Sequence, residues 1–308
     1  MCRVRLLALF MLFVTPALFA APAERAIMVR EANLYLNPDT SSQKIGDVGR
    51  GREVAIVAKT REWLQVFANV DQERDVTGWI LDKAVVRAST PHGDEIVYGE
   101  AVDSEAEASR PHGRRGADKD AMRLYARMAE YFPNSPLAGQ AAYRAADIRW
   151  QIDAEDVRTL PSSKERDPNL RPKIEEEYMR EVMKKFPGTK WADLAAFHLL
   201  DNKLCGDWQG LPKCPEKEIE IYEKYVKEHP NSPAAPEALY DAAWRSAALI
   251  EIYKSNDEPN KVGATKQRAM SLAQQITSSY GKTDWGPRAE RLAYLVEQGV
   301  PTYGTQIE

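Results

Sequence analysis

The residues of this 308-residue chain best suited to chemistry are its three cysteines and four histidines. Eight residues separate Cys205 from Cys214, and no C-x-x-C pair or second ligand pair accompanies them, as a structural zinc site would require. In an oxidising compartment, an isolated pair at this spacing predicts a disulfide worth roughly 2 to 3 kcal/mol in the chain-entropy model. We therefore expect a Cys205–Cys214 disulfide, with a zinc or redox pair as the alternative.

The other reactive residues do not form a catalytic set. No G-x-S-x-G elbow presents a serine nucleophile. Gly281-Lys282-Thr283 matches the end of a phosphate-binding loop, but Ile276 stands where that loop needs its first glycine. His92 and His112 fall in a polar segment, whereas His198 and His229 are interpreted as structural. We expect no enzymatic activity, no cofactor and no metal ion.

A short phrase recurs along the second half of the chain. It stands at Tyr131–Pro136 and Glu228–Pro233, with looser copies at Phe186–Thr189 and Tyr280–Thr283. In each copy an aromatic residue or histidine closes one helix, and a Ser or Thr is placed to cap the next. Proline in the phrase blocks continuation of the first helix. The phrase therefore predicts four helix–turn–helix corners.

Apolar residues spaced three or four apart flank each corner, as expected for amphipathic helices. The stripe before each corner is bulky: Tyr125, Met128 and Phe132; Tyr178, Val182 and Phe186; Ile219, Tyr222, Val226 and His229; Leu272, Ile276 and Tyr280. The stripe after each corner is alanine: Ala138, Ala141, Ala142 and Ala145; Ala192, Ala195 and Ala196; Ala235, Ala238 and Ala242; Ala289 and Ala293. Because alanine lets a second helix lie close to the first, the pattern predicts four helix pairs stacked into an α-solenoid.

This pattern, aromatic-Pro-x-Ser/Thr-x-x-Ala-x-x-Ala, resembles the tetratricopeptide-like repeats of bacterial envelope proteins, such as the repeat-containing lipoprotein of the outer-membrane β-barrel assembly machinery and the periplasmic coordinator of the Tol-Pal system. The resemblance covers residues 118–298, with corners 54, 43 and 51 residues apart where a standard repeat has about 34. It implies a scaffold that binds an envelope protein or a peptide segment. The binding face is expected on polar positions of the first helices, at Arg123, Arg127, Glu220 and Lys224.

Residues 24–90 are of a different kind and predict a small all-β barrel. Runs rich in β-branched and aromatic residues, Glu53–Lys59, Trp63–Val70 and Thr77–Leu81, alternate with turn clusters. Alternation along the second run places Leu64, Val66 and Ala68 on one face, which we expect to be core, and Trp63, Gln65 and Phe67 on the other.

The order of residues in this region, ending in Gly78-Trp79-Ile80, resembles the bacterial SH3-like domain. Such domains bind cell-wall peptides or dock against a neighbouring domain. The resemblance therefore implies a ligand groove at Tyr35, Trp63 and Trp79, with plain packing of these rings as the alternative.

The remaining segments complete the expected organisation. Residues 1–23 have a basic start, an apolar stretch from Leu6 to Val14 and small residues at Ala20 and Ala23, either of which suits cleavage. This pattern predicts a secretory signal peptide, with an N-terminal membrane helix as the alternative. Residues 91–117 lack periodicity and predict a flexible linker, residues 152–173 a second polar insertion, and residues 299–308 a C-terminal tail.

The expected fold class is α+β multidomain: an SH3-like barrel followed by a solenoid of about four helix pairs. The formal charge of −4 and the pI near 5.8 disfavour a dedicated nucleic-acid binder. The leading hypothesis is a non-enzymatic periplasmic adaptor in envelope assembly or maintenance, without a transmembrane segment after signal cleavage. The alternative is a peptidoglycan-recognition protein whose repeats serve as a spacer.

Overall fold

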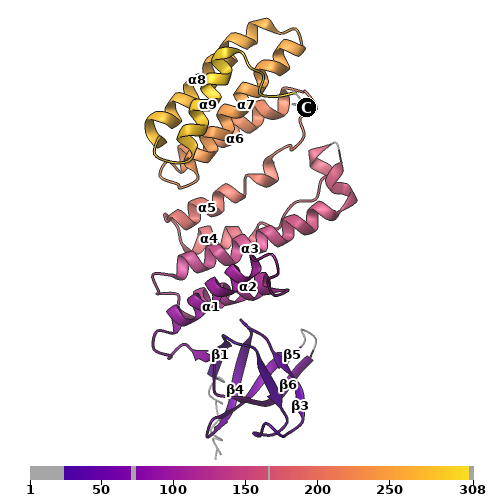
Figure 1. The fold of residues 1–308 in the computed structure, drawn as a ribbon, viewed down its shortest axis with the longest axis vertical. Helices are drawn as coiled ribbons and strands as arrows, with labels where there is room; N and C mark the ends of the chain where they lie inside the picture. Colours follow the sequence, from indigo (N-terminus) through magenta and orange to yellow (C-terminus); the bar gives the residue numbers. More distant parts are fainter. Residues whose placement is uncertain (1–23, 71–73, 166, 305–308) are drawn as a thin grey trace, which may run out of the picture.

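The computed structural model describes residues 24–70, 74–165 and 167–304. An all-β unit at one end is followed by helices stacked along the long axis of the molecule (Figure 1). This arrangement confirms the predicted order of an all-β domain and a helical solenoid. The predicted signal peptide lies outside the described residues. Within the ranges given, no helix has the length and apolar character that crossing a bilayer requires.

The all-β unit is a curled sheet of seven strands in the described ranges: β1 Glu24–Met28, β2 Ala32–Tyr35, β3 Lys44–Val48, β4 Glu53–Thr60, β5 Trp63–Val70, β6 Arg74–Leu81 and β7 Val85–Arg87. All the paired strands are antiparallel, in the spatial order β3-β2-β6-β5-β4-β1-β7. Because β3 and β7 remain edges, the sheet forms a half-barrel rather than a closed barrel. The edge strand β7 lies against helix α1 (Gly93–Ala108).

The inner face of the half-barrel holds the residues that alternation predicted. Leu64 and Val66 have no exposed surface, Ala68 is 2% exposed, and all three belong to one apolar cluster with Leu34 and Ile80. The expected strands match β4, β5 and β6 closely. Period-two patterning was therefore sufficient to place the core of this unit.

In the described residues the helical part comprises the four predicted pairs, preceded by an additional helix, α1. The pairs are α2 (Ala117–Tyr131) with α3 (Ala138–Thr159), α4 (Glu177–Lys185) with α5 (Lys190–His198), α6 (Lys213–Glu228) with α7 (Ala235–Ser255), and α8 (Pro259–Tyr280) with α9 (Trp285–Gln298). The members of each pair pack against each other, and most of the expected bulky and alanine stripes are buried between them. Tyr178 is an exception, since 44% of it is exposed.

One corner caps its helix as predicted: Thr189 is the N-cap of α5, and its side-chain oxygen accepts from the backbone N–H of Ala192 at 3.4 Å. At the other three corners the prediction of a helix cap is wrong, because the helices α3, α7 and α9 have no side-chain cap bond. There the oxygens of Ser135, Ser232 and Thr283 accept from the backbone N–H two residues ahead, at 3.2, 3.1 and 3.3 Å, and stabilise the turn before the helix.

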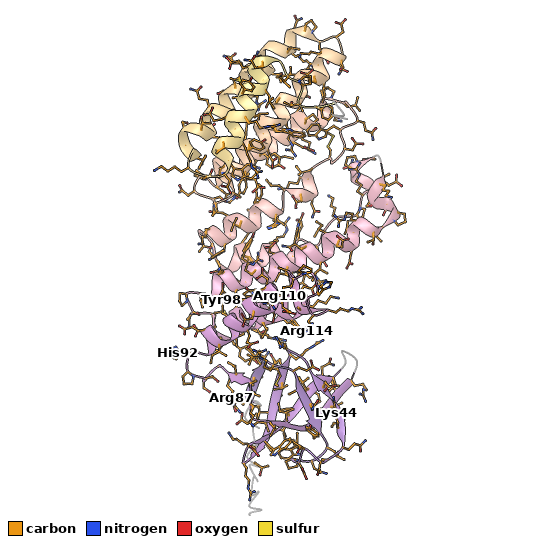
Figure 2. All side chains as sticks on the ribbon, viewed as in Figure 1. Lys44, Arg87, His92, Tyr98, Arg110 and Arg114 are labelled. Carbon is orange, nitrogen blue, oxygen red and sulfur yellow. A yellow bond between two sulfur atoms is a disulfide. The ribbon has the colours of Figure 1, made fainter. Side chains whose placement is uncertain are left out.

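The predicted flexible linker is wrong, because much of residues 91–117 forms helix α1. Val97 and Ala101 of this helix are completely buried, and Tyr98 packs edge-on against Tyr125 of α2 with ring centres 5.5 Å apart. Figure 2 labels Tyr98 on this helix. Arg110 and Arg114, at the basic end of the segment, pair with Glu107 and Asp120. The sequence pattern did not predict this helix, because its buried residues are small or widely spaced and its amphipathic stripe is therefore weak.

A single apolar cluster joins the half-barrel to the helices. It combines Ile27, Val29 and Val86 of the half-barrel with Val97 of α1 and Leu124 of α2. The segment between β3 and β4 also touches α2 at Gly51, which has a φ of +69°. A β-carbon there would lie 2.6 Å from the β-carbon of Arg123. Only glycine suits both that backbone angle and that close contact.

The second predicted insertion, residues 152–173, is also partly regular. Helix α3 continues through its first part to Thr159, and two short 3₁₀ turns follow, η1 at Pro161–Lys164 and η2 at Pro168–Leu170. The first charged residues of the segment therefore extend α3, whose earlier turns are buried, and only the part of the segment after Thr159 is irregular.

The shared cluster makes a prediction about cooperativity. We expect Leu124→Ala to lower the free energy of unfolding by about 2 to 5 kcal/mol, because Leu124 is completely buried. Native-state hydrogen exchange read by mass spectrometry should show faster exchange in the half-barrel as well as in α1 and α2. Leu170→Ala is the matched control, since Leu170 is 64% exposed and should change stability by less than about 0.5 kcal/mol. Faster exchange confined to the helices would contradict a shared core.

Candidate functional site

Two of the four residues expected on the solenoid's binding face lie at the contact with the half-barrel instead. Nε of Arg123 donates to the carbonyl oxygen of Arg50 at 3.3 Å, and Nη1 of Arg127 lies 3.2 Å from Oε2 of Glu53. Arg25 joins the same ion-pair network through Glu53. Arg123 and Arg127 therefore join the two units, which corrects their expected role. The sequence placed them on a first helix but could not show that α2 is covered.

The other two, Glu220 and Lys224, are exposed one turn apart on α6. The ammonium group of Lys224 lies 3.8 Å from a carboxylate oxygen of Glu228, which is a loose surface pair. These two residues remain available to a partner.

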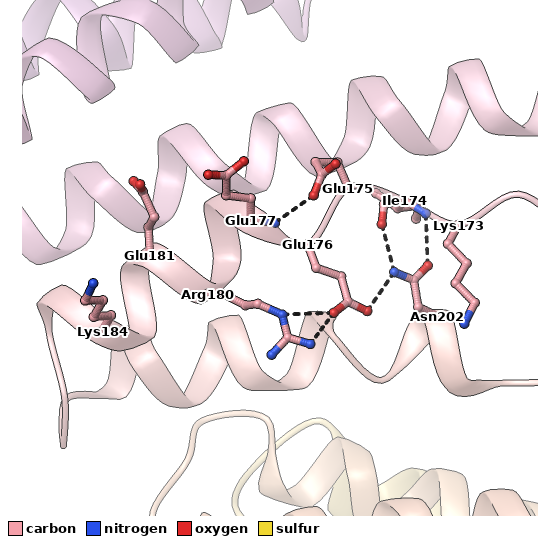
Figure 3. Close-up of a pocket in the computed structure, with 9 residues that line it drawn as sticks. All are labelled: Lys173, Ile174, Glu175, Glu176, Glu177, Arg180, Glu181, Lys184 and Asn202. Carbon is pink, nitrogen blue, oxygen red and sulfur yellow. Dashed lines mark hydrogen bonds and ion pairs between the residues drawn. The ribbon is translucent and has the colours of Figure 1, made fainter.

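A charged hollow with a volume of about 680 Å³ lies along α4 (Figure 3). It is lined by Lys173, Ile174, Glu175, Glu176, Glu177, Arg180, Glu181, Lys184 and Asn202. The sequence does not reveal this hollow, because Asn202 comes from the segment after α5 and no local pattern connects that residue to α4.

Asn202 fixes one wall of the hollow. Its side-chain amide bonds both backbone groups of Ile174, at 3.0 and 2.8 Å, and donates to Oε1 of Glu176 at 3.0 Å. The guanidinium of Arg180 holds the other oxygen of Glu176. By contrast, Lys173 and Lys184 form no hydrogen bond or ion pair within the described part of the chain. The hollow therefore combines a fixed carboxylate with two free ammonium groups.

The three aromatic residues expected in a ligand groove do gather on one face of the half-barrel. Tyr35 is the cross-strand partner of Trp79, and its ring meets that of Trp63 edge-on with centres 5.8 Å apart. Trp63 is only 7% exposed, so packing accounts for most of its surface. Phe67 and Val57, on the neighbouring strands β5 and β4, are about half exposed. The cross-strand partners of Trp79 and Phe67 are Gln65 and Thr77, so the face carries polar side chains among its rings and is partly open.

The predicted disulfide is present: Cys205 and Cys214 are bonded, with α-carbons 6.0 Å apart. The bridge ties the segment after α5 to the first turn of α6. Within the loop, the backbone N–H of Cys205 and the indole N–H of Trp208 both donate to the carboxylate of Glu218, at 2.8 and 3.2 Å. Glu218 is 1% exposed and also accepts from Arg245 of α7 at 2.6 Å. A buried charge held this completely fixes the loop against both helices.

The same loop holds the C-terminal end of the described chain. The ring of Trp208 packs against Trp244 of α7 and against Tyr303, with centres 5.3 and 5.4 Å apart. The backbone N–H of Gly210 donates to the Tyr303 hydroxyl at 3.2 Å. Residues Gly299–Gly304, hereafter the C-terminal strap, therefore return from α9 to the disulfide loop.

Asp201, which follows α5, and Glu237 and Asp241 of α7 have raised pKa values. Burial is the main cause for each, and the charges of Asp241 and Asp201 raise the pKa of Glu237 further. A hydrogen bond from the Trp150 indole N–H lowers the pKa of Asp201, and the charge of Arg245 lowers that of Asp241, so each partly opposes the effect of burial.

The two helical histidines make structural contacts, consistent with their interpretation from the sequence. Nδ1 of His229 lies 2.7 Å from a carboxylate oxygen of Asp193, and His198 bonds the hydroxyl of Tyr143 at 3.1 Å. Both contacts connect consecutive helix pairs. Among the described residues, no group of three or more His, Cys, Asp or Glu side chains is arranged to hold a metal ion.

Comparison with known proteins yields only distant structural likenesses. No protein-family model and no curated protein matches the chain. Among solved structures, the chain is similar to "DHF79 filament", with 18% identity, 66% of this chain and 100% of that chain covered, and a TM-score of 0.25. It is also similar to the "de novo designed helical repeat protein DHR64", with 18% identity, 67% and 94% coverage, and a TM-score of 0.24.

Removing the disulfide should weaken the junction at α6. We expect Cys205→Ser combined with Cys214→Ser to lower the free energy of unfolding by roughly 2 to 3 kcal/mol, since a short closed loop is released. Denaturant titration with and without a thiol reductant measures this, and the reductant should have no further effect on the double variant. Two free thiols detected by a thiol-specific reagent in the untreated protein would contradict the bridge.

The raised pKa of Glu237 makes stability depend on pH. Because the folded chain favours the protonated form, the stabilising contribution of Glu237 is present below its unfolded pKa and is lost as pH rises through its folded pKa. Glu237→Gln should therefore be more stable than the natural chain at about pH 7 and equally stable near pH 3. Glu220→Gln, on the exposed face of α6, should be neutral at both pH values. A Glu237→Gln protein less stable than the natural chain at neutral pH would refute the assignment.

Proposed function

We propose that the protein is a non-enzymatic, exported scaffold that binds protein or peptide partners during cell-envelope assembly or maintenance, in the periplasm. The observation that carries this proposal is the hollow along α4. Its lining combines the free ammonium groups of Lys173 and Lys184 with the carboxylate of Glu176, which Arg180 and Asn202 hold in place. Fixed and mobile charges of both signs suit a polar polypeptide segment better than a small apolar ligand.

The architecture supports the same function. Stacked helix pairs expose side chains from successive helices over a long surface, and here that surface includes the hollow on α4 and the exposed Glu220 and Lys224 on α6. The half-barrel shares a core with α1 and α2, so it acts as a cap on the first helix pair. A cap of this kind keeps the terminal helices from exposing their apolar side.

A second candidate function is recognition of peptidoglycan by the half-barrel. The observation that favours it is the partly open face on which Phe67, Trp79 and Tyr35 lie, with exposed aromatic surface at Phe67. Aromatic rings on such a face can contact the apolar sides of sugars or peptides. In this case the helices would act as a spacer.

Charge reversal in the hollow separates the two functions. We expect Lys173→Glu combined with Lys184→Glu, in the whole chain, to reduce crosslinked partner recovered from envelope extracts at least about tenfold, a change of about 1.4 kcal/mol. Lys119→Glu combined with Lys282→Glu is the matched control, because both lysines lie outside the hollow, and recovery should be unchanged.

The half-barrel is tested in the same experiment with Phe67→Ser. Under the scaffold proposal this variant recovers the same partner, and the natural chain does not sediment with purified sacculi. Two results together would overturn the scaffold proposal in favour of peptidoglycan recognition. The natural chain would sediment with sacculi and Phe67→Ser would abolish this, while the Lys173→Glu, Lys184→Glu variant would recover as much partner as the natural chain.

A further inference from the structure

A second and smaller cavity lies where α7, α8 and α9 meet the C-terminal strap. These three helices pack side by side at the end of the molecule far from the half-barrel (Figure 1). The cavity has a volume of about 210 Å³, below the roughly 300 Å³ at which pockets for drug-sized ligands begin. It therefore has room for one small chemical group and is too small for a helix or an extended segment.

The inner wall of this cavity is aliphatic. Ala247 and Ile250 of α7 and Val296 of α9 are almost completely buried, and Val262 of α8 is partly buried beside them. No aromatic ring contributes to this lining. A branched aliphatic group matches such a wall in both shape and polarity.

The rim of the cavity carries a net positive charge. Lys254 is paired with Glu251 at 2.9 Å, and both line the cavity. Lys266 has a different environment: its ammonium donates only to the backbone carbonyl of Glu297, at 3.3 Å, so no carboxylate among the described residues neutralises it. The lining therefore has one uncompensated positive charge, which a single carboxylate would balance.

The strap adds a polar group at the same place. Thr302 lines the cavity, and its hydroxyl oxygen is buried without a hydrogen-bond partner in the described ranges. A buried hydroxyl without a partner is costly, and it could donate to an anion bound beside Lys266. An aliphatic wall, one free ammonium and one buried hydroxyl together define a small amphipathic anion.

We propose that this cavity binds the C-terminal residue of a polypeptide, with a branched aliphatic side chain against Ile250 and Val296 and the terminal carboxylate at Lys266 and Thr302. The inference that the partner is a polypeptide rests on the proposed scaffold function. The residue after Thr302 is Tyr303, which packs on Trp208 of the disulfide loop. The disulfide loop therefore holds the strap, and with it Thr302, in place over the cavity.

Matched small probes test the chemistry with the whole chain. Calorimetric titration with N-acetyl-L-valine and N-acetyl-L-valinamide compares ligands that differ only in the terminal carboxylate. We expect the acid to bind at least about tenfold more tightly than the amide. Equal affinities, or no binding of the acid at about 10 mM, would overturn the proposal. Isovalerate lacks the acylated nitrogen, and tighter binding of isovalerate than of N-acetyl-L-valine would assign the cavity to a free carboxylic acid instead.

Variants on one helix locate the site. Lys266→Gln should weaken binding of N-acetyl-L-valine about tenfold, whereas Lys261→Gln, on the same helix but outside the cavity and paired with Glu258, should leave it unchanged. Thr302→Val keeps the shape of the side chain and should also weaken binding. Equal affinity in the Lys266→Gln variant would contradict the assignment. If N-acetyl-L-valine does not bind but the α4 hollow still captures a partner, only the proposal for this cavity is overturned. If N-acetyl-L-valine binds but charge reversal in the hollow leaves partner capture unchanged, only the scaffold proposal is overturned.

Discussion

Burial of apolar side chains between the half-barrel and the first helices is the interaction on which the rest of the structure depends. Ile27, Val29 and Val86 of the half-barrel lie in one cluster with Val97 and Leu124. Each such side chain contributes about 1.5 to 3 kcal/mol when removed from water, so separating the two units would expose a large part of the core. The ion pairs that cross between the units, Arg25 with Glu130 and Arg127 with Glu53, are partly exposed and are worth much less. They fix the orientation of units that the apolar contact joins.

A second junction, between α5 and α6, has a different physical basis. Here polar and covalent links add to apolar contact: Phe197 packs on the ring of Tyr225 within a shared apolar cluster, Asp193 bonds His229, and the disulfide loop anchors Glu218 and Arg245. The charged hollow on α4 lies before this junction, and the cavity under the C-terminal strap lies after it. The two candidate sites therefore belong to parts of the solenoid whose relative position the disulfide loop helps to set.

Local patterns predicted much of the fold. Alternation identified the core strand of the half-barrel, the repeated phrase located all four corners and the Thr189 cap of α5, and cysteine spacing indicated the disulfide. Helix α1 was missed because Gly93, Val97 and Ala101 form too weak an apolar stripe. The sites were harder to predict because they depend on contacts between distant residues. Arg123 donates to the backbone carbonyl of Arg50, and Asn202 closes a hollow built on α4; no spacing in the sequence reveals either contact.

The most direct test of this account is whether the half-barrel and the solenoid form one body. Spin labels on cysteines introduced at Thr77 and Lys184 would report the distance between the units by pulsed electron paramagnetic resonance, since both positions lie outside the buried core and the native pair is bonded. A single narrow distance distribution is expected, because α1 joins the units through a buried cluster. A broad distribution, such as a flexible linker over residues 91–117 would give, would contradict the account.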